Sequence, residues 1–326
     1  MKVHILDDWF DTLRGLPCFE RLTGHEVTVW TDHVEDTDTL AERLQEAEVL
    51  VLFRERTKVT RSLLGKLPNL KLISQRSVYP HVDVEACTDH RVLLCSNMHG
   101  GTPSYAAAEL TWALIMVGMR DLPAQMASVK AGHWQAGVGK TLRGRQLGLY
   151  GYGRIARAVA GYAEAFGMNV VWWSSEEGRT RVQADGAQVA PSREAFFGSS
   201  DVVSIHVRLK PDTRGIITAP DFAQMQPDAL FVNTSRAGLI APGALLEALN
   251  AGRPGKAAID VFDSEPLIDP TDPLLSHPNL IATPHIGFVT EDEFDLQFAD
   301  IFDQVNAFAE GAPIHIINPE VWASAE

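Results

Sequence analysis

The sequence predicts an α/β protein with two doubly wound parallel sheets, and three observations support this class. Short runs rich in β-branched and aromatic residues alternate with helical patterns, which is typical of parallel strands joined by crossover helices. The chain has 326 residues, more than one ordinary core accommodates, so about two domains are expected. A long helical region near the middle separates the runs into two sets.

Each set of runs predicts one sheet. The first set consists of residues 2–6, 27–30, 49–53, 70–74 and 92–96, with a helix expected at residues 39–48. The second set consists of residues 146–151, 169–173, 201–207, 229–235, 256–262 and 280–284. The chain is therefore expected to form two α/β lobes.

Two helical segments are expected to join the lobes. The first extends from Pro103 to about Gly132, with Thr102 as N-cap and the proline at the first helical position. The second follows Thr290, which forms a capping-box pattern with Glu293 ahead of an amphipathic stretch.

Composition excludes several classes of protein. Apolar residues make up 45% of the chain and charged residues 21%, as in ordinary globular proteins. A net charge of −14 argues against nucleic acid or an anionic membrane as the main partner. The longest apolar stretch, residues 110–119, is too short to span a bilayer, and the N-terminal "MKVHILDD" predicts a strand rather than a signal peptide.

The cysteines and histidines predict neither a disulfide framework nor a metal site. Cys18, Cys87 and Cys95 form no C-x-x-C pair and suggest a reduced, cytoplasmic setting, and Cys95 lies in an apolar run where a small buried side chain is expected. The eleven histidines include no H-x-x-E-H motif, which argues against a zinc enzyme.

The stretch "YGYGRIA" carries the most informative motif. It fits G-x-G-x-x-A between a predicted strand and a predicted helix, with the next strand also in place. The glycines leave room for a pyrophosphate at the helix N-terminus, so the motif predicts dinucleotide binding. The predicted cofactor-binding residues of this loop are Gly151, Tyr152, Gly153, Arg154 and Ile155.

The choice between NAD and NADP stays open. The end of the second strand of such a domain normally carries an acid that binds the ribose hydroxyls, and here Ser174 stands in its place. Arg179 or Arg181 would pair with a 2′-phosphate, whereas Glu176 or Glu177 would replace the missing acid. Ser174 is included among the predicted cofactor-binding residues.

Three motifs at later strand ends complete the pattern: "FVNTSRAG", "AIDVFDSEP" and "IATPHIGF". Together with the glycine loop, they resemble the D-isomer-specific 2-hydroxyacid dehydrogenase family over nearly the whole chain. The resemblance implies a flavodoxin-like substrate lobe and a Rossmann-like NAD(P)-binding lobe. It also implies an oxidoreductase that transfers a hydride between NAD(P)(H) and C2 of a D-2-hydroxy acid or 2-keto acid.

The resemblance assigns catalytic roles to three residues. Arg236 matches the arginine that binds the substrate carboxylate, work suited to a planar, bidentate cation. His285 matches the general acid/base. Glu265 matches the carboxylate that hydrogen-bonds the imidazole, fixes its orientation and favours its protonated form. The resemblance also implies further cofactor-lining positions, with Asp260 near the nicotinamide amide: His206, Thr213, Thr234, Ser235, Asp260 and Gly287.

The substrate lobe departs from the family pattern. The segment "ISQRSVYPHVD" lacks the glycine loop whose amides usually bind the substrate carboxylate, and Arg76, Ser77 and Val78 stand there instead. In the phosphoglycerate branch of the family an arginine near this place in the chain meets the substrate phosphate, which suggests that role for Arg54; the alternative is an ion pair with Glu55 or another acid. Phosphoglycerate, hydroxypyruvate and glyoxylate types of substrate all stay open.

The resemblance also sets domain limits and partners. The substrate domain is expected at residues 1–97 and 288–326 and the dinucleotide-binding domain at residues 98–287, with the two connecting helices as a hinge and "HGGTP" in place of the family's usual Pro-Gly. The resemblance implies a homodimer, with the segment that contains Trp134 as part of the contact; the alternative is that Trp134 is an ordinary buried tryptophan. The alternative is a nucleotide-sensing corepressor on the same fold, in which binding rather than turnover is the output.

Overall fold

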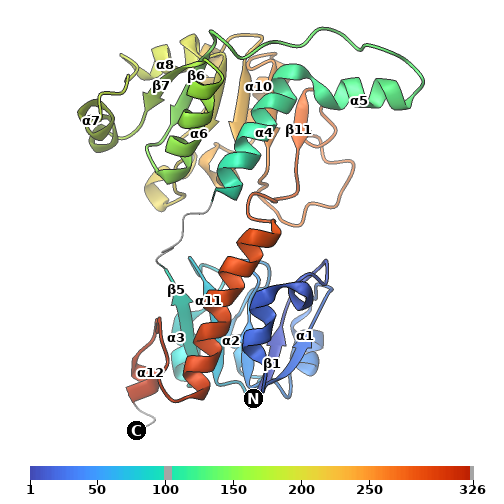
Figure 1. Cartoon of the computed structure of the whole chain (residues 1–326), viewed down its shortest axis with the longest axis vertical. Coiled ribbons are helices and arrows are strands. Elements are labelled where there is room, and N and C mark those ends of the chain that lie inside the picture. Colours follow the sequence, from blue (N-terminus) through green and yellow to red (C-terminus); the bar gives the residue numbers. More distant parts are fainter. Residues whose placement is uncertain (99–104, 324–326) are drawn as a thin grey trace. The chain divides into compact units, whose positions relative to one another are not determined.

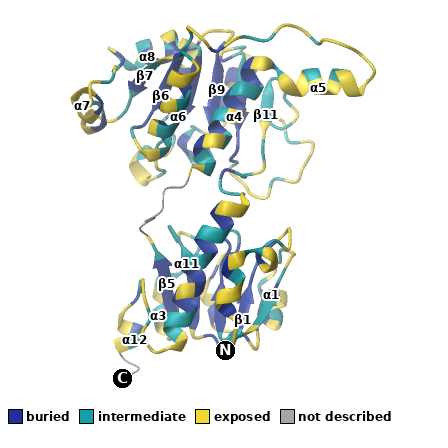
Figure 2. Cartoon of the chain, viewed as in Figure 1, coloured by how far each residue is buried: buried dark blue, intermediate teal, exposed yellow. Residues whose placement is uncertain are grey.

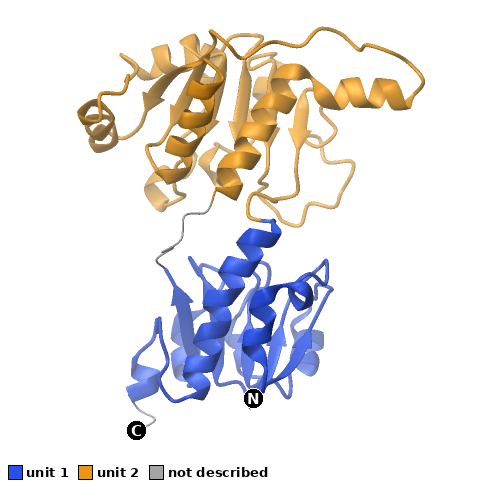
Figure 3. Cartoon of the chain, in the orientation of Figure 1, with its two compact units in different colours: residues 1–104, 289–326 blue, residues 105–288 orange. Residues whose placement is uncertain are grey.

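The computed structural model describes residues 1–98 and 105–323 and divides the chain into two compact units. Unit 1 comprises residues 1–104 and 289–326, and unit 2 comprises residues 105–288 (Figure 3). Compared with the limits expected at about 97 and 287, the first division lies seven residues later and the second one residue later. The predicted helix start at Thr102 and Pro103, and the "HGGTP" segment, lie outside the described residues.

Unit 1 is built on a parallel sheet of five strands in the order β2-β1-β3-β4-β5, the flavodoxin-like doubly wound order (Figure 1). Each of the five runs predicted for the first lobe overlaps one of these strands, and β2, β4 and β5 extend one or two residues beyond the predicted run. Their bounds are β1 Lys2–Ile5, β2 Glu26–Val29, β3 Val49–Val51, β4 Leu72–Arg76 and β5 Leu93–Asn97.

Helices cover both faces of this sheet. On one face, three short helices pack through an apolar cluster: α1 Thr37–Arg43, α2 Arg61–Leu64 and α3 Val84–Asp89. The long helix α11, Glu291–Ala309, packs against β4, β5 and the 3-10 helix η2, Pro17–Leu22. Its rings of Phe294 and Phe298 lie 4.9 and 4.7 Å from the ring of Phe53. The remaining short helices are η1 Leu13–Gly15 and α12 Glu320–Ala323.

The cap of α11 agrees only in part with the predicted capping box. The Thr290 hydroxyl accepts a hydrogen bond from the Glu293 amide at 3.2 Å, as expected. The Glu293 carboxylate, however, accepts a hydrogen bond from Gln297 at 2.7 Å. The side chain of Glu293 is therefore used inside the helix, where it is buried.

Unit 2 contains a parallel sheet of six strands in the order β11-β10-β9-β8-β6-β7. An isolated parallel bridge between Val189 and Trp172 adds a minimal further pairing beside β7. Each run predicted for the second lobe contains one strand: β6 Gln146–Tyr150, β7 Asn169–Trp173, β8 Val202–Ile205, β9 Leu230–Asn233, β10 Lys256–Ile259 and β11 Leu280–Ala282. Figure 2 shows the inner strands of this sheet buried, whereas the edge strand β11 is only partly buried.

Two apolar clusters, one on each face, hold the helices of unit 2 to its sheet. The first face carries α4 Ala106–Arg120, α6 Arg154–Ala165 and α7 Glu176–Ala184. The second face carries α8 Arg193–Ser199, α9 Ala219–Gln224 and α10 Ala244–Asn250. Two 3-10 turns, η3 Pro211–Thr213 and η4 Ala237–Leu239, lie in the loops.

The helical region predicted before β6 consists of two helices rather than one. Helix α4 ends at Arg120, the next residue Asp121 has a left-handed φ of 54°, and α5, Leu122–Lys130, begins directly after it. Every residue of α5 is at least partly exposed, and the helix projects from the rest of unit 2 (Figures 1 and 2). Met126 is 58% exposed and Val129 57%, and Trp134 beyond the helix is 76% exposed.

The cysteines are buried and unbonded. Cys95 is fully buried, as expected from its apolar run, and Cys18 and Cys87 are buried too. Burial raises the pKa of each thiol to about 12, so all three stay protonated at neutral pH. Among the helices of the described residues, none is both long enough and apolar enough to cross a membrane.

Candidate active site

The carboxyl ends of the parallel strands of unit 2 meet at one edge of the sheet. Catalytic and binding groups of open α/β sheets gather at this edge. The predicted residues follow these strand ends: Gly151 after β6, Ser174 after β7, His206 after β8, Thr234 to Arg236 after β9, Asp260 after β10 and His285 after β11.

The glycine loop after β6 has the space that a dinucleotide needs. Gly151 has a φ of 109°, and a Cβ there would lie 2.4 Å from the carbonyl oxygen of His206, so only glycine fits. A Cβ at Gly153 would meet nothing within 4 Å. Gly153 is the N-cap of α6 and provides no side-chain cap, which leaves the first amides of this helix available for a phosphate.

The other residues of this loop differ in exposure. The Tyr152 hydroxyl donates to the Asp185 carboxylate, which raises the pKa of Tyr152, and its ring packs edge-on against Trp172 at 4.8 Å. Arg154 is exposed and Ile155 is partly buried at the start of α6. The loop is thus anchored by its aromatic side chain while its glycine backbone is open.

His206, at the end of β8, is neutral. Its Nε2 lies 2.9 Å from the Ser204 hydroxyl, and burial lowers the pKa of His206 to about 4. Its amide donates to the Tyr150 carbonyl, which ties the end of β8 to β6. This imidazole therefore offers a hydrogen bond rather than a charge at neutral pH.

The hydroxyl side chains predicted to line the cofactor have different surroundings. Ser235 donates to the Ile205 carbonyl at 2.8 Å, and Thr234 lies 2.6 Å from the hydroxyl of Thr111 on α4. Both therefore brace the end of β9. The hydroxyl of Thr213, by contrast, forms its hydrogen bonds within its own turn after β8.

Asp260 holds the turn that carries His285. It is fully buried, and its Oδ1 accepts hydrogen bonds from the Thr283 hydroxyl at 2.6 Å and the Ile286 amide at 2.9 Å. Its Oδ2 accepts from the Gly287 amide at 2.9 Å. Burial raises the pKa of Asp260, although these three hydrogen bonds act in the opposite direction. The carboxyl group thus holds the chain on both sides of His285, through a side chain before it and two backbone amides after it.

The turn itself aims the imidazole. The His285 amide donates to the Thr283 carbonyl at 3.0 Å, with Pro284 between them, and His285 has a left-handed φ of 53°. A non-glycine residue adopts this conformation at a cost that its surroundings must offset. The Nδ1 of the ring lies 2.5 Å from Oε2 of Glu265.

Glu265 keeps its negative charge beside this ring. Its second oxygen, Oε1, accepts a hydrogen bond from the Phe262 amide at 2.9 Å. Burial acts to raise the pKa of Glu265, but the hydrogen bond and charge of His285, the Phe262 amide and the charge of Arg236 together lower it. Because the carboxylate is charged, Nδ1 of His285 must be the donor, which leaves Nε2 to exchange a proton.

Arg236 follows β9 and is partly buried. Its Nη1 donates to the Ser235 carbonyl at 2.8 Å, and its own carbonyl accepts from the Asn233 amide group at 3.0 Å. The three residues assigned to catalysis therefore belong to one electrostatic group, since the charge of Arg236 acts on Glu265.

Sequence reasoning did not single out three residues that support this site. Asn233 braces the β9 end, Thr283 binds Asp260, and Thr111 contacts Thr234 from α4. The first two lie inside the motifs "FVNTSRAG" and "IATPHIGF", so their polar side chains beside strand ends were a usable signal. Thr111 lies in an apolar helix and offers no such local signal.

The predicted substrate-binding residues lie at strand ends of unit 1. Arg54 follows β3 with a left-handed φ of 58°, and its Nε lies 3.7 Å from the Glu55 carboxylate, as the ion-pair alternative expected. Arg76 ends β4, is 9% exposed, and its Nε lies 3.1 Å from Asp300.

The turn after β4 restricts how backbone amides there can act. Ser77 has a left-handed φ of 78°, and its amide donates to the Asn97 carbonyl at 3.1 Å. That amide is thus already used, whereas Val78 is partly exposed beside it. A carboxylate would have to be bound here by side chains or by other amides.

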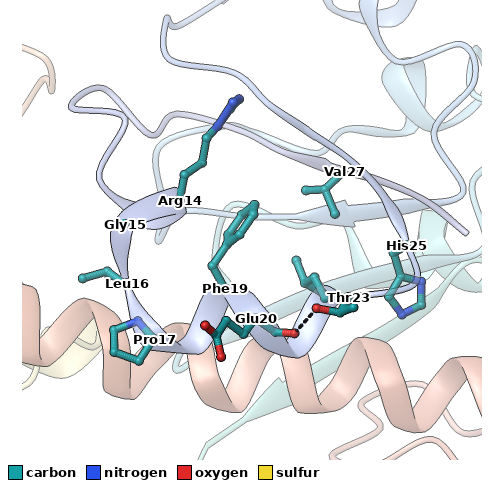
Figure 4. Close-up of a pocket in the computed structure, with 10 residues that line it drawn as sticks. Arg14, Gly15, Leu16, Pro17, Phe19, Glu20, Thr23, His25 and Val27 are labelled. Carbon is teal, nitrogen blue, oxygen red and sulfur yellow. Dashed lines mark hydrogen bonds between the residues drawn. The ribbon is translucent and has the colours of Figure 1, made fainter.

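A surface hollow of about 620 Å³ lies elsewhere in unit 1, lined by residues between Arg14 and Val27 (Figure 4). It includes none of the residues predicted for the site, so it is not a candidate for the chemistry. Within residues 1–98 and 105–323, no group of three or more His, Cys, Asp or Glu is arranged to hold a metal ion.

Comparison with known proteins identifies the family. Residues 112–287 match the model of the D-isomer specific 2-hydroxyacid dehydrogenase NAD binding domain. Over almost its full length, the chain is 30% identical to the glyoxylate reductase of Thermococcus litoralis, with 95% of each protein covered. The chain belongs to the D-isomer specific 2-hydroxyacid dehydrogenase family, and the residues that match the NAD binding domain model lie within unit 2.

Two further relatives extend this comparison. A crystal structure from Ralstonia solanacearum, provisionally assigned as a D-3-phosphoglycerate dehydrogenase oxidoreductase, matches with 45% identity and a TM-score of 0.93 over 98% of each chain. The D-3-phosphoglycerate dehydrogenase of Methanocaldococcus jannaschii is 35% identical over 84% of this chain. The chain spans about half the length of that enzyme, 52%.

Proposed function

We propose that the chain catalyses hydride transfer between NAD(P)(H) and C2 of a D-2-hydroxy acid or its 2-keto acid. The observation that carries this proposal is the His285–Glu265 pair, held by Asp260 at the strand edge where the glycine loop also lies. The relatives described above are named for reactions on small acids of this class.

The residues of the glycine loop fit a dinucleotide. Gly151, Gly153 and the first amides of α6 would hold its pyrophosphate, with His206, Thr234 and Ser235 lining the remainder. Asp260 and Gly287 are proposed to act near the nicotinamide through the turn that they fix. When bound, the nicotinamide supplies or accepts the hydride.

Proton transfer falls to His285. During reduction, Nε2 of the protonated ring would donate to the oxygen at C2, and during oxidation it would accept that proton. Glu265, hydrogen-bonded to Nδ1, keeps the ring oriented and places a negative charge beside it. Arg236 would bind the substrate carboxylate with its planar guanidinium and place the reacting carbon.

The acid groups of the substrate need cations, and unit 1 supplies candidates. We propose that Arg54, Arg76, Ser77 and Val78 bind the substrate. Arg76 supports this role because its Nη1 is buried and has no hydrogen-bond partner among the described residues. A small 2-keto acid such as hydroxypyruvate, glyoxylate or 3-phosphohydroxypyruvate provides the matching negative charge.

We also propose that the chain forms a homodimer in the cytoplasm. The projecting α5 segment exposes apolar side chains that a monomer would leave in water, including Met126, Val129 and Trp134. Three buried, unbonded cysteines are compatible with a reducing compartment.

The test is the loss of absorbance of reduced cofactor. NADH and NADPH are each assayed with hydroxypyruvate, glyoxylate, pyruvate and 3-phosphohydroxypyruvate, and the His285→Ala variant serves as the matched control. Turnover that depends on His285 supports the proposal. Tight dinucleotide binding without turnover of any acid would contradict it and favour a sensor of the corepressor type.

A further inference from the structure

The junction between β7 and α7 differs from that of an NAD-selective domain. An acid at the end of the second strand normally accepts hydrogen bonds from the ribose hydroxyls and repels a 2′-phosphate. Here β7 ends at Trp173, and the next residue is the neutral Ser174. The electrostatic barrier to a 2′-phosphate from this position is therefore absent.

Helix α7 is packed closely onto this serine. A Cβ at Gly178 would lie 2.2 Å from the Ser174 hydroxyl oxygen, so only glycine allows the approach. The Ser175 hydroxyl accepts the Gly178 amide at 3.2 Å and caps the helix. These two contacts fix the first turn of α7, and Arg179 follows it directly.

Arg179 is held at the end of β7. Its Nη1 donates to the Ser174 carbonyl at 2.7 Å, and its guanidinium carbon lies 4.5 Å from the centre of the Trp173 ring. The hydrogen bond uses one of five N–H donors, and the ring covers one face of the plane. One edge of the Arg179 guanidinium thus stays available for a phosphate. A guanidinium can bind a phosphate in bidentate fashion.

The positive charge of Arg179 is not neutralised by the neighbouring carboxylates. Glu176 and Glu177 are exposed in the first turn of α7, and in the described part of the chain neither forms an ion pair with Arg179. Arg181, the other arginine of this helix, is exposed. The structure therefore distinguishes Arg179 from Arg181 as a candidate for binding the 2′-phosphate, which the sequence alone could not do.

We propose that Arg179, with the hydroxyl of Ser174, binds the 2′-phosphate of NADP(H), so that unit 2 prefers NADP(H) to NAD(H). This inference rests on the proposed function only in that the glycine loop binds the dinucleotide. It names the specificity-determining cation of that site.

The test is calorimetric titration of the full chain with 2′,5′-ADP and 5′-AMP, which differ by the phosphate in question. We expect 2′,5′-ADP to bind at least about tenfold more tightly, a difference of about 1.4 kcal/mol. Arg179→Met should weaken 2′,5′-ADP at least about tenfold and leave 5′-AMP nearly unchanged, since one charge-assisted bidentate contact is lost. Arg181→Met, on the same helix, should leave both affinities unchanged.

Three outcomes would overturn the inference: 5′-AMP binding as tightly as 2′,5′-ADP, equal losses for both nucleotides in Arg179→Met, or the same selective loss in Arg181→Met. If the methionine variant fails to fold, Arg179→Gln is used, because its stem still covers Trp173. Selective 2′,5′-ADP binding without turnover contradicts the proposed activity alone. Turnover with NADH together with weak 2′,5′-ADP binding contradicts this inference alone.

Discussion

The Nδ1 atom of His285 and the Oε2 atom of Glu265 lie 2.5 Å apart, although the two residues are twenty positions apart in the chain. The contact joins the loop after β10 to the turn after β11. Because the carboxylate is negatively charged and bound to Nδ1, the opposite ring nitrogen is left for proton exchange.

Removing the imidazole should separate chemistry from binding. His285→Ala is expected to lower turnover by about 100-fold or more, the usual contribution of an acid/base group, while NADH and NADPH affinities change little. Steady-state kinetics and fluorescence titration measure the two effects. His277→Ala, a partly exposed histidine before β11, is the control and should keep both properties. Near-normal turnover in His285→Ala would refute the assigned role.

Replacing the carboxylate should change the pH dependence of reduction. Glu265→Gln keeps the shape of the side chain but removes the negative charge that is hydrogen-bonded to Nδ1 of His285, so the rate of reduction should depend on pH differently in the variant. Because the pKa of Glu265 is lowered, the pair stays intact as pH falls past the ordinary glutamate range. The contribution of the Glu265–His285 pair to stability is present above the ordinary pKa of a glutamate. It is lost only as pH falls through the lowered pKa of Glu265. Rate profiles from pH 4 to 9 test this, and identical profiles would contradict it.

Replacing each of the two loop glycines with alanine should affect different properties of the protein: stability in one case and dinucleotide affinity in the other. Gly151→Ala places a Cβ against the His206 carbonyl at a positive φ, so unfolding free energy should fall by at least about 2 kcal/mol. Gly153→Ala meets no protein atom within 4 Å and should keep its stability but lose dinucleotide affinity. Urea unfolding and dinucleotide titration separate the two. Gly153→Ala binding like the unmodified chain would argue against a pyrophosphate there.

Charges on the α5 segment should disrupt the proposed dimer. Met126→Glu together with Val129→Glu places two carboxylates where we expect an apolar contact, and sedimentation velocity should then show a monomer. Phe10→Glu, at an equally exposed apolar residue of unit 1 (59% exposed), is the matched control. A monomeric unmodified chain, or a dimer that tolerates both charges, would count against this contact.

The eleven strands of the described residues could be predicted from the sequence, because each coincides largely with a short β-rich run bounded by turn or helix signals. The break at Asp121 was not predicted, since a left-handed residue inside a helical pattern carries little sequence signal. The site was predictable as three motifs at strand ends. That Asp260 fixes the His285 turn was not, because hydrogen bonds between residues 23 to 27 positions apart depend on how two strands pair.

The separation of Arg179 from Arg181 also required the structure. Both arginines follow Ser174 within a few residues, and composition cannot tell which one faces the strand. The structure distinguishes them, because Arg179 donates to the Ser174 carbonyl and lies over the Trp173 ring, whereas Arg181 is exposed.

The division of unit 1 into two sequence segments has a consequence for synthesis. Phe53 lies in the first segment, but the rings that cover it, Phe294 and Phe298, are added only after all of unit 2 has been made. Unit 2 is one continuous segment and can fold on the ribosome as it emerges. Until α11 has been synthesised, one apolar face of the sheet formed by the first hundred residues stays uncovered. Chaperones are therefore expected to bind mainly to this nascent segment.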